Sequence, residues 1–486
     1  MLFNSLQFAA FFPVVTILYF VLPHRHRWWL LLGASAYFYM AFVPSYILIL
    51  GVTIVVDYFA GIFIEEAKST GRKKAYLMMS LVANIGFLAF FKYFNFANTN
   101  IVVLADMIGW NYSMQNLKII LPIGLSFHTF QAMSYTIEVF RGHQKTERHF
   151  GIYALYVLFY PQLVAGPIEC PQNMLHQFHE EHFFDYQRVA DGLKLMAWGL
   201  FKKVMIADRL ASLVKTYYGN PQGFSGPELA LATAYFAVQI FCDFSGYSDI
   251  AIGAAQVMGF KLMVNFKRPY LALSISEFWK RWHISLSTWF RDYLYIPLGG
   301  NRVSAWRWQF NLFIVFLVSG LWHGANWTYV IWGALHGVYL ILEIKAQKVW
   351  DAIPEKIRAI PPVWLLRLSQ RILVLSLVGY AWIFFRAESL ETAWYIGTKV
   401  FSGWTDGSAL LGLARSILKN YELLITFFAI VIMETIHYFQ ERGSLRAMLA
   451  QRPAVLRWAL YVGVLVCILI FGRIYAAPTD FIYFQF

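Results

Sequence analysis

The sequence predicts an all-α polytopic membrane protein. Of its 486 residues, 59% are hydrophobic and only 14% are charged, whereas roughly 25% of residues are charged in an ordinary soluble protein. The apolar residues are spread through nearly the whole chain instead of being concentrated in a few cores. These two observations exclude a water-soluble domain as the main body of the protein.

Apolar segments of about membrane-spanning length, which is roughly 20 residues, recur along the chain. They cover approximately 6–22, 28–43, 46–64, 75–96, 119–139, 150–166, 189–206, 230–257, 311–322, 327–344, 372–385, 423–438 and 456–474. The first segment has no basic stretch before it and no small-residue cleavage site after it, so we interpret it as a retained helix and not as a signal peptide. Several segments are short, which indicates tilted, re-entrant or broken helices.

Basic clusters predict the orientation of the first helices. They occur at 24–27, 68–74 and 141–149, after the first, third and fifth apolar segments. Because Lys and Arg in short loops stay in the cytoplasm, this alternation places the N-terminus outside the cytoplasm. The net charge of +13 is then explained by cytoplasmic loops, and nucleic acid is not an expected partner.

The domain organisation is predicted to be a single integral membrane domain over 1–486. A charged seam at 351–362 separates a centre rich in polar motifs, about 120–345, from the C-terminal helices, about 363–486. Cys170, Cys242 and Cys467 are isolated in sequence, so neither a disulfide framework nor a metal site is indicated. The stretches 167–188 and 268–307 are too polar to span a membrane, and we expect the chemistry there or nearby.

One polar motif interrupts the apolar segment 230–257. It places Asp243, Ser245, Tyr247 and Asp249 close together. Ionisable groups in a membrane segment are costly and need a partner or a purpose. A hydrogen-bonded packing site, with Gly246 allowing close approach of a second helix, and a contact to substrate or to a cation are both compatible with the motif.

A second polar motif covers 277–292 and contains neither Gly nor Pro. If it is one helix, Lys280, His283, Ser287 and Arg291 are three or four residues apart and share one face. That basic face can lie at the membrane interface as part of an amphipathic helix. It can also receive the phosphates of an anionic donor.

The third motif is Trp322-His323-Gly324, followed by Asn326. His323 ends an apolar run between Gly320 and Gly324, where the backbone can break and a ligand can approach. Since a neutral imidazole in a membrane is a natural proton acceptor, we predict that His323 is catalytic. The intramembrane His336 is interpreted as a helix-packing residue.

Other polar residues carry weaker signals. The His and Glu residues within 176–182 resemble metal ligands in spacing only, and we expect no metal site. Asp57, Lys92 and His128 interrupt apolar segments and are expected to pair within the helix bundle. The sequence has no P-loop, GxGxxG, GxSxG or HExxH motif, which argues against ATP-driven transport and soluble-type hydrolysis.

Taken together, the motifs resemble one family over nearly the full length. In chain order they are PIGLSFHTFQ (122–131), VAGPI (164–168), GLFKK (199–203), DFSGYSD (243–249), RWHISLS (281–287), the stretch 291–302, GLWHG (320–324) and WIFFRA (382–387). The set resembles the membrane-bound O-acyltransferase (MBOAT) superfamily, and within it the bacterial branch typified by the membrane subunit of alginate O-acetylation. His128 departs from many relatives, which carry an aromatic residue there.

The resemblance implies a ring of transmembrane helices around a thin centre, with re-entrant or horizontal helices and a through-tunnel. It further implies that the family's near-invariant histidine is His323 and that its second conserved polar position is His283. Lys280, Ser287 and Arg291 become candidate donor contacts, whereas Asp243, Ser245, Tyr247, Asp249, Trp322, Asn326 and His336 become polar or structural residues of the tunnel.

The expected function is transfer of an acetyl or other short acyl group from a cytoplasmic thioester, acetyl-CoA or an acyl carrier, with no bound cofactor. The acceptor would be an extracytoplasmic polysaccharide, reached directly or through a partner acetyltransferase, and the protein would reside in the bacterial inner membrane. The rival hypothesis is a conduit for a lipid-linked glycan or an ion, in which the same buried groups line a pathway.

Overall fold

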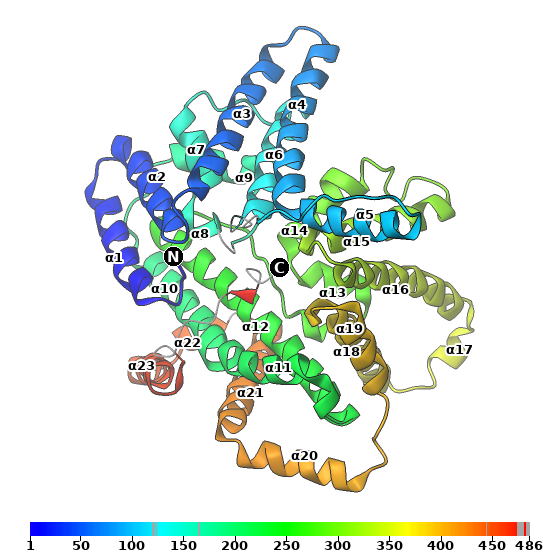
Figure 1. Cartoon of the computed structure of the whole chain (residues 1–486). Coiled ribbons are helices and arrows are strands. Elements are labelled where there is room, and N and C mark those ends of the chain that lie inside the picture. Colours follow the sequence, from blue (N-terminus) through cyan, green and yellow to red (C-terminus); the bar gives the residue numbers. More distant parts are fainter. Residues whose placement is uncertain (119–121, 123, 164–165, 444, 474–480, 483–486) are drawn as a thin grey trace. The chain divides into compact units, whose positions relative to one another are not determined.

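The computed structural model describes residues 1–118, 122, 124–163, 166–443, 445–473 and 481–482. Within them all regular structure is helical (Figure 1). Among these residues, seven helices are long and apolar enough to cross a membrane, namely Tyr46–Glu66, Thr70–Met107, Gly226–Met258, Trp327–Ala352, Val363–Arg386, Tyr421–Arg442 and Ala454–Phe471, and the apolar helix Leu6–Val21 is shorter. The predicted all-α, multi-pass membrane class is therefore confirmed.

Three predicted features fall partly on residues outside the described ones. These three are apolar segments, namely 119–139, 150–166 and 456–474, and two of the motifs, 122–131 and 164–168, also include residues outside the described ones. Elsewhere the helices run past the predicted apolar segments. The segment 311–322, for example, belongs to a helix that begins at Ala305, because polar residues outside the apolar stretch continue the backbone hydrogen-bond ladder.

The chain folds into two compact units, which are described separately. Unit 1 comprises Met1–Met196 and Ile250–Val264, and unit 2 comprises Ala197–Asp249 and Asn265–Phe486. The helices of unit 1 are α1 Leu6–Val21, α2 His24–Met40, α3 Tyr46–Glu66, α4 Thr70–Leu88, the π-helix η1 Ala89–Tyr93, α5 Phe94–Met107, α6 Leu125–Arg141, α7 Phe150–Leu158, α8 Tyr160–Leu163, α9 Pro171–His179 and most of α10 Tyr186–Phe201.

A buried polar cluster joins α3, α4 and α6 in unit 1. The Asp57 carboxylate accepts hydrogen bonds from Ser80 Oγ at 2.6 Å and from Asn84 Nδ2 at 2.9 Å. Ser80 also lies 3.0 Å from Thr136 Oγ1. Asp57 is expected to pair within the helix bundle, and its partners are the neutral donors Ser80 and Asn84.

The three basic clusters of unit 1 lie at one end of that unit. Arg148, in the loop after α6, pairs with Glu65 and Glu66 at the end of α3, at 2.8 and 2.7 Å. His149 packs against Trp28 at the start of α2, with ring centroids 4.6 Å apart. The clusters 24–27, at the start of α2, 68–74, at the start of α4, and 141–149 therefore lie at one end of unit 1, as a common cytoplasmic side requires.

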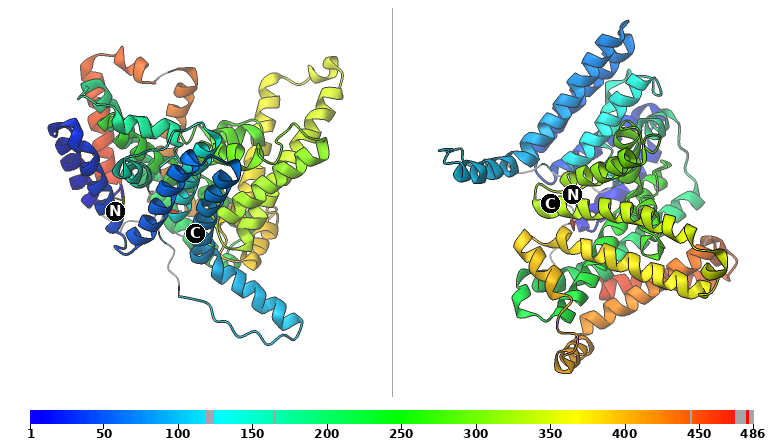
Figure 2. Two further views of the ribbon diagram at one scale, coloured as in Figure 1. Left: turned by 90° about the horizontal axis from the view of Figure 1, so that it is seen from above. Right: turned by 90° about the vertical axis from the view of Figure 1, so that its right-hand side faces the viewer.

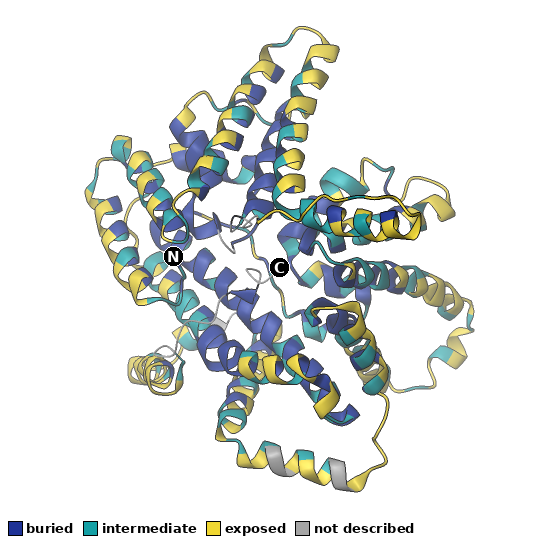
Figure 3. Ribbon diagram, viewed as in Figure 1, coloured by how far each residue is buried: buried dark blue, intermediate teal, exposed yellow. Residues whose placement is uncertain are grey.

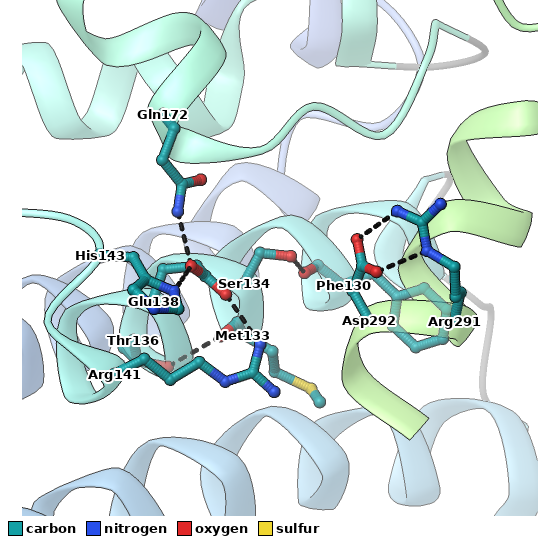
Figure 4. A network of polar contacts seen from close by, with 10 residues as sticks. All are labelled: Phe130, Met133, Ser134, Thr136, Glu138, Arg141, His143, Gln172, Arg291 and Asp292. Carbon is teal, nitrogen blue, oxygen red and sulfur yellow. Dashed lines mark hydrogen bonds and ion pairs between the residues drawn. The ribbon is translucent and has the colours of Figure 1, made fainter. Parts of the chain in front are cut away.

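Glu138 ties the end of α6 to its neighbours in unit 1. Its carboxylate accepts hydrogen bonds from Arg141 at 3.0 Å, from His143 Nδ1 at 3.0 Å and from Gln172 of α9 at 2.6 Å (Figure 4). Glu138 itself is buried. Three donors around one buried carboxylate satisfy its lone pairs and fix the turn that follows α6.

The predicted segment 150–166 is broken. α7 ends at Leu158 and the short α8 begins at Tyr160. Pro161 has no N–H to donate to a continuous helix, and the Tyr160 N–H donates instead to Ser35 Oγ of α2 at 3.1 Å. The segment is therefore a pair of short helices held by a side-chain hydrogen bond.

Unit 2 holds the remaining helices. They are η2 Lys202–Ala207, α11 Asp208–Gly219, η3 Pro221–Gly223, α12 Gly226–Met258, which continues into unit 1 after Asp249, η4 Pro269–Leu271, α13 Ile275–Arg281, α14 Ile284–Phe290, η5 Arg291–Tyr295, α15 Ala305–His323, α16 Trp327–Ala352, α17 Glu355–Arg358, α18 Val363–Arg386, α19 Leu390–Lys399, α20 Gly407–Lys419, α21 Tyr421–Arg442, α22 Leu445–Ala450 and α23 Ala454–Phe471. The predicted seam 351–362 forms the turn around α17, where α16 and α18 extend as a hairpin (Figure 2).

Burial differs sharply among the helices of unit 2. Most of α12 is buried, whereas α23 is largely exposed (Figure 3). An exposed apolar helix is suited to lipid. The polar motif of α12, by contrast, lies inside the protein and must find its partners there.

α15 and α16 run side by side at very close range (Figure 1). A Cβ added at Gly320 would lie 2.3 Å from the Tyr329 carbonyl oxygen, and one added at Gly333 would lie 2.3 Å from the Phe316 carbonyl oxygen. Only glycine permits this approach, as in other small-residue helix contacts in membranes. The contact also bears on the predicted catalytic residue, because α15 ends at His323.

We expect Gly333→Ala to destabilise the protein by about 1–3 kcal/mol, the usual penalty for overpacking, because the new methyl group meets backbone that cannot rotate away. Gly379→Ala in α18 is the matched control, since a Cβ there meets nothing within 4 Å. Thermal unfolding of the two variants in the same detergent measures the difference. If both variants have the same unfolding temperature, the backbones of α15 and α16 can move apart at no cost in stability.

Candidate active site

Lys203 is the centre of a buried ion-pair cluster in unit 2. Its Nζ lies 2.6 Å from Asp243 Oδ1 and 2.8 Å from Asp208 Oδ1, and the lysine side chain is only 1% exposed. It also lies 5.4 Å from the centroid of the Tyr247 ring. The Ile482 N–H donates to the other Asp243 oxygen at 2.7 Å.

Lys202 makes a second, separate set of contacts with α12. Its Nζ lies 2.8 Å from Asp249 Oδ2 and donates to Ser245 Oγ at 2.8 Å. A Cβ on Gly246 would lie 2.8 Å from the Gly199 carbonyl oxygen, so glycine here permits the close approach that brings both lysines to α12. These pairs favour the packing interpretation of the α12 motif over a direct substrate contact.

The predicted continuous helix over 277–292 is wrong. α13 ends at Arg281 and α14 begins at Ile284, with Trp282 extended and His283 in the left-handed region at φ 43°. Consequently Lys280, His283, Ser287 and Arg291 do not share one helical face.

Backbone pairing with the preceding loop explains the break. The Lys267 N–H donates to the Arg281 carbonyl at 2.9 Å, and the Ile284 N–H donates to the Asn265 carbonyl at 2.9 Å. These bonds replace the bonds that a continuous helix would make. The left-handed conformation of a residue with a side chain costs about 1–2 kcal/mol, and such strain is found preferentially at functional sites.

His283 is fully buried. Its Nδ1 lies 3.1 Å from Asn265 Oδ1. Its ring packs edge-on against Phe244 of α12, with centroids 4.6 Å apart. Because burial lowers the pKa of His283 to about 3, the ring is neutral at pH 7.

His323 is the last residue of α15 and is 5% exposed. Its ring packs against Trp322, Trp332 and Phe385, with centroids 4.9, 4.9 and 5.3 Å away. Gly324 ends the helix, and a Cβ there would lie 2.1 Å from the Tyr329 ring. The structure thus encloses His323 in an aromatic wall whose packing requires the flanking glycine.

His336, one turn beyond Trp332 on α16, is fully buried. The indole N–H of Trp279 donates to its Nδ1 at 3.3 Å. His336 also contacts the Trp332 ring at 5.1 Å between centroids. This geometry gives His336 a hydrogen-bond role between α13 and α16, in line with the packing interpretation.

Indole rings connect the three histidines within unit 2. Trp322 lies against both His283, at 6.4 Å between centroids, and His323, at 4.9 Å. Trp332 lies against both His323 and His336. The structure therefore brings His283 and His323, which are 40 residues apart in sequence, into contact with the same tryptophan ring, and both histidines are buried.

The three candidate donor contacts lie elsewhere. Lys280 is exposed at the end of α13. Ser287 Oγ donates to the Trp282 carbonyl at 3.4 Å. Arg291 is 59% exposed and pairs with Asp292 at 2.7 Å (Figure 4). The two cations are the most exposed of the three, and they do not share one helix face with His283.

Asn326 has a structural position. Its side-chain oxygen accepts the Thr328 N–H at 3.1 Å and caps α16, while its amide donates to the Glu388 carbonyl at 3.2 Å. The cap starts α16 immediately after the turn that carries His323. Asn326 therefore positions the backbone around the histidine.

The histidines of 176–182 take part in separate contacts of unit 1. His176 lies 3.0 Å from the Gln172 carbonyl, His179 pairs with Glu147 at 2.7 Å, and His182 lies 3.0 Å from the Gln177 carbonyl. Their side chains have different partners and do not converge on one point.

Sequence reasoning missed Asn265. It contacts His283 and Ser285, and its amide donates to Ser248 Oγ at 3.2 Å. The available signal was a single amide in the otherwise apolar run 262–266, but nothing in that run indicates which of the distant histidines it meets.

Comparison with known proteins gives a consistent result. The family described as MBOAT, membrane-bound O-acyltransferase family, matches residues 76–385, more than half of the chain. That range includes His283, Asn265 and His323.

Similar proteins extend the match. The chain is 38% identical to a probable alginate O-acetylase of Azotobacter vinelandii, over 89% of this chain and 84% of that protein. It is 35% identical to a peptidoglycan O-acetyltransferase of Helicobacter pylori, over 90% and 86% of the two chains. It is 30% identical to a teichoic acid D-alanyltransferase of Streptococcus thermophilus, over 45% and 56%.

Proposed function

Because the chain belongs to the membrane-bound O-acyltransferase family, as its motifs predict, and is therefore an O-acyltransferase, we propose that it moves an acetyl group from a cytoplasmic thioester for O-acetylation of an extracytoplasmic polysaccharide. The observation that carries the proposal is the pair of buried histidines, His283 and His323, which both contact the Trp322 ring. Acyl transfer needs a proton acceptor in a site from which water is excluded.

His323 acts as the general base in this proposal. It accepts the proton of the acceptor hydroxyl as that oxygen attacks the thioester carbonyl. The new C–O bond forms, the C–S bond breaks, and the proton passes to the departing thiolate. The aromatic wall around His323 protects the thioester from hydrolysis, because a water molecule in the same place would be activated just as an alcohol is.

His283, which also contacts Trp322, supports the same reaction by orienting the donor. The donor is acetyl-CoA or an acyl-carrier thioester. Lys280 and Arg291, both exposed, are the proposed contacts to its phosphates, and Ser287 is a third contact. For Arg291 this requires exchange of its Asp292 partner for phosphate, which guanidinium binds equally well through two parallel hydrogen bonds.

The basic clusters of unit 1 support the sidedness that we propose for the reaction. Its three basic clusters share one end, and basic loops remain cytoplasmic. We therefore place the N-terminus on the outer side of the bacterial inner membrane. The similarity to proteins named for alginate and peptidoglycan O-acetylation supports a glycan hydroxyl as the final acceptor, reached directly or through a partner acetyltransferase.

The test uses the purified full-length protein in lipid nanodiscs with acetyl-CoA labelled in the acetyl group. We expect CoA release that depends on an added acceptor, either a glycan fragment or a candidate partner acetyltransferase, with the label recovered as an ester. A conduit would leave the thioester intact while it moves a glycan or an ion across vesicles. Transport without thioester consumption would overturn the proposal.

A further inference from the structure

Asn265 holds the Nδ1 side of His283 through one oxygen atom. Asn265 Oδ1 lies 3.1 Å from His283 Nδ1, 3.2 Å from the Ser285 backbone nitrogen and 3.0 Å from Ser285 Oγ. Its Nδ2 donates to Ser248 Oγ of α12 at 3.2 Å. Asn265 is completely buried, so these contacts are made without competition from water.

The backbone settles which end of the amide faces the histidine. A side-chain amide can in general be placed in either of two orientations, but the Ser285 N–H can only donate. The atom that it meets must therefore be the amide oxygen. The same oxygen lies 3.1 Å from His283 Nδ1, whereas the Ser285 hydroxyl, which donates to that oxygen at 3.0 Å, lies 3.5 Å from Nδ1. The shorter contact, to an oxygen that can only accept, assigns the proton to Nδ1.

The tautomer of His283 follows from this. A neutral imidazole has one protonated nitrogen and one basic nitrogen. With the proton on Nδ1, the basic nitrogen is Nε2. Three rings of the described residues that contact His283 are Phe244 of α12, Phe266 of the loop before α13 and Trp322 of α15, and none of these three side chains titrates.

The same residue also fixes the position of the ring. The Asn265 carbonyl accepts the Ile284 N–H at 2.9 Å, so Asn265 binds both the side chain of His283 and the backbone next to it. His283 has the left-handed backbone conformation, which a residue with a side chain adopts only when its surroundings enforce it. Asn265 enforces it through both of these contacts.

We propose that Asn265 is a positioning residue of the acyltransferase site and that it holds His283 as the Nδ1–H tautomer. In this tautomer Nε2 accepts a hydrogen bond from an N–H or O–H group of the substrate. The inference rests on the proposed function, because it assumes that His283 serves acyl transfer. It assigns His283 an accepting role, in which the neutral ring does not donate to a developing oxyanion.

Three variants test the proposal. Asn265→Ala removes the acceptor, Asn265→Asp keeps an oxygen in the same place, and Asn311→Ala is the control. Asn311 is also a fully buried asparagine of unit 2, but its amide binds the carbonyls of Leu298 and Gly300. Thioester turnover is measured from pH 5 to 9 with labelled acetyl-CoA, together with the melting temperature.

We expect Asn265→Ala to lower kcat by about 10–100-fold, the range found when a hydrogen-bond partner that orients a functional histidine is removed. Asn265→Asp should restore turnover in the alkaline range. In this variant the acid limb of the pH–rate profile should move to higher pH. A carboxylate beside Nδ1–H stabilises the imidazolium form of His283, and the imidazolium has no basic nitrogen to accept a hydrogen bond. Asn311→Ala should keep the wild-type pH profile even where it lowers the melting temperature.

Two results would overturn the inference. One is Asn265→Ala with the wild-type rate and pH profile, and the other is Asn265→Asp that is as inactive as Asn265→Ala at every pH although both remain folded. Failure of the proposed function looks different, because the wild-type protein itself would then consume no thioester.

Discussion

Replacement of His323 by alanine is expected to reduce acyl transfer by about 10²–10⁴-fold, the contribution typical of a positioned general base. His323 is buried at the end of α15 between three aromatic rings, so the variant leaves a dry cavity in which no other group replaces the imidazole. Release of CoA from labelled acetyl-CoA, measured at saturating acceptor, reports the loss directly.

The matched control is His437→Ala. His437 is also a buried histidine of unit 2, but it lies on α21, where its Nδ1 is 3.3 Å from Glu434 and its ring packs on Trp198 and Phe241. Both substitutions remove a buried ring, so both lower the melting temperature, whereas only His323→Ala should lower turnover of the folded protein. A folded His323→Ala protein with wild-type turnover would remove His323 from the mechanism.

Hydropathy was sufficient to predict most of the helices. The apolar segments at 46–64, 230–257 and 327–344 correspond to α3, α12 and α16, because a lipid-facing or buried helix must be apolar along a run of fixed length. The signal does not locate helix ends. Polar ends such as the first turns of α15 make the same backbone hydrogen bonds as the apolar centre does.

The break at His283 could not be predicted from local sequence. The residues from Glu277 to Asp292 include neither Gly nor Pro, and their intrinsic preference allows one helix. What breaks the helix is the loop at Asn265 and Lys267, which takes over the hydrogen bonds of Ile284 and Arg281. Tertiary contacts of this kind override local preference, and they frequently do so at functional sites.

The histidines themselves were recognisable for a different reason. An ionisable group in an apolar run is costly enough to need a purpose, so His323 stands out in sequence without any knowledge of its neighbours. Its aromatic surroundings come from Trp332 and Phe385, 9 and 62 residues further along the chain. No spacing rule connects such distant positions, so the wall around the histidine required the structure.

The polar motif of α12 was ambiguous for a related reason. Whether Asp243 and Asp249 meet a substrate or a structural partner depends on Lys202 and Lys203, which lie about 40 residues earlier in a π-helix. Lys202 pairs with Asp249 and Lys203 with Asp208 and Asp243, and no local pattern in the sequence indicates these partners. The motif is therefore best tested through its lysines.

Lys203→Met is expected to destabilise the protein by about 3–5 kcal/mol, the cost of removing one partner from a buried ion pair. The substitution keeps an unbranched side chain of similar length but leaves the buried carboxylates of Asp208 and Asp243 without their shared cation. Lys280→Met is the control, because Lys280 is exposed and an exposed cation contributes little to stability. Thermal and denaturant unfolding in one detergent compare the two.

A triple variant separates charge from packing. If Lys203→Met fails because two carboxylates are left facing each other, then Asp208→Asn and Asp243→Asn added to it should recover most of the lost stability, since neutral amides carry no buried charge and can hydrogen-bond to each other. The Asp243→Asn change keeps the contact with Ile482, whose N–H needs only an acceptor oxygen. If Lys203→Met is as stable to unfolding as the Lys280→Met control, the buried ion pair does not stabilise the protein. If the triple variant is no more stable than Lys203→Met alone, the lysine stabilises the protein through packing and not through its charge.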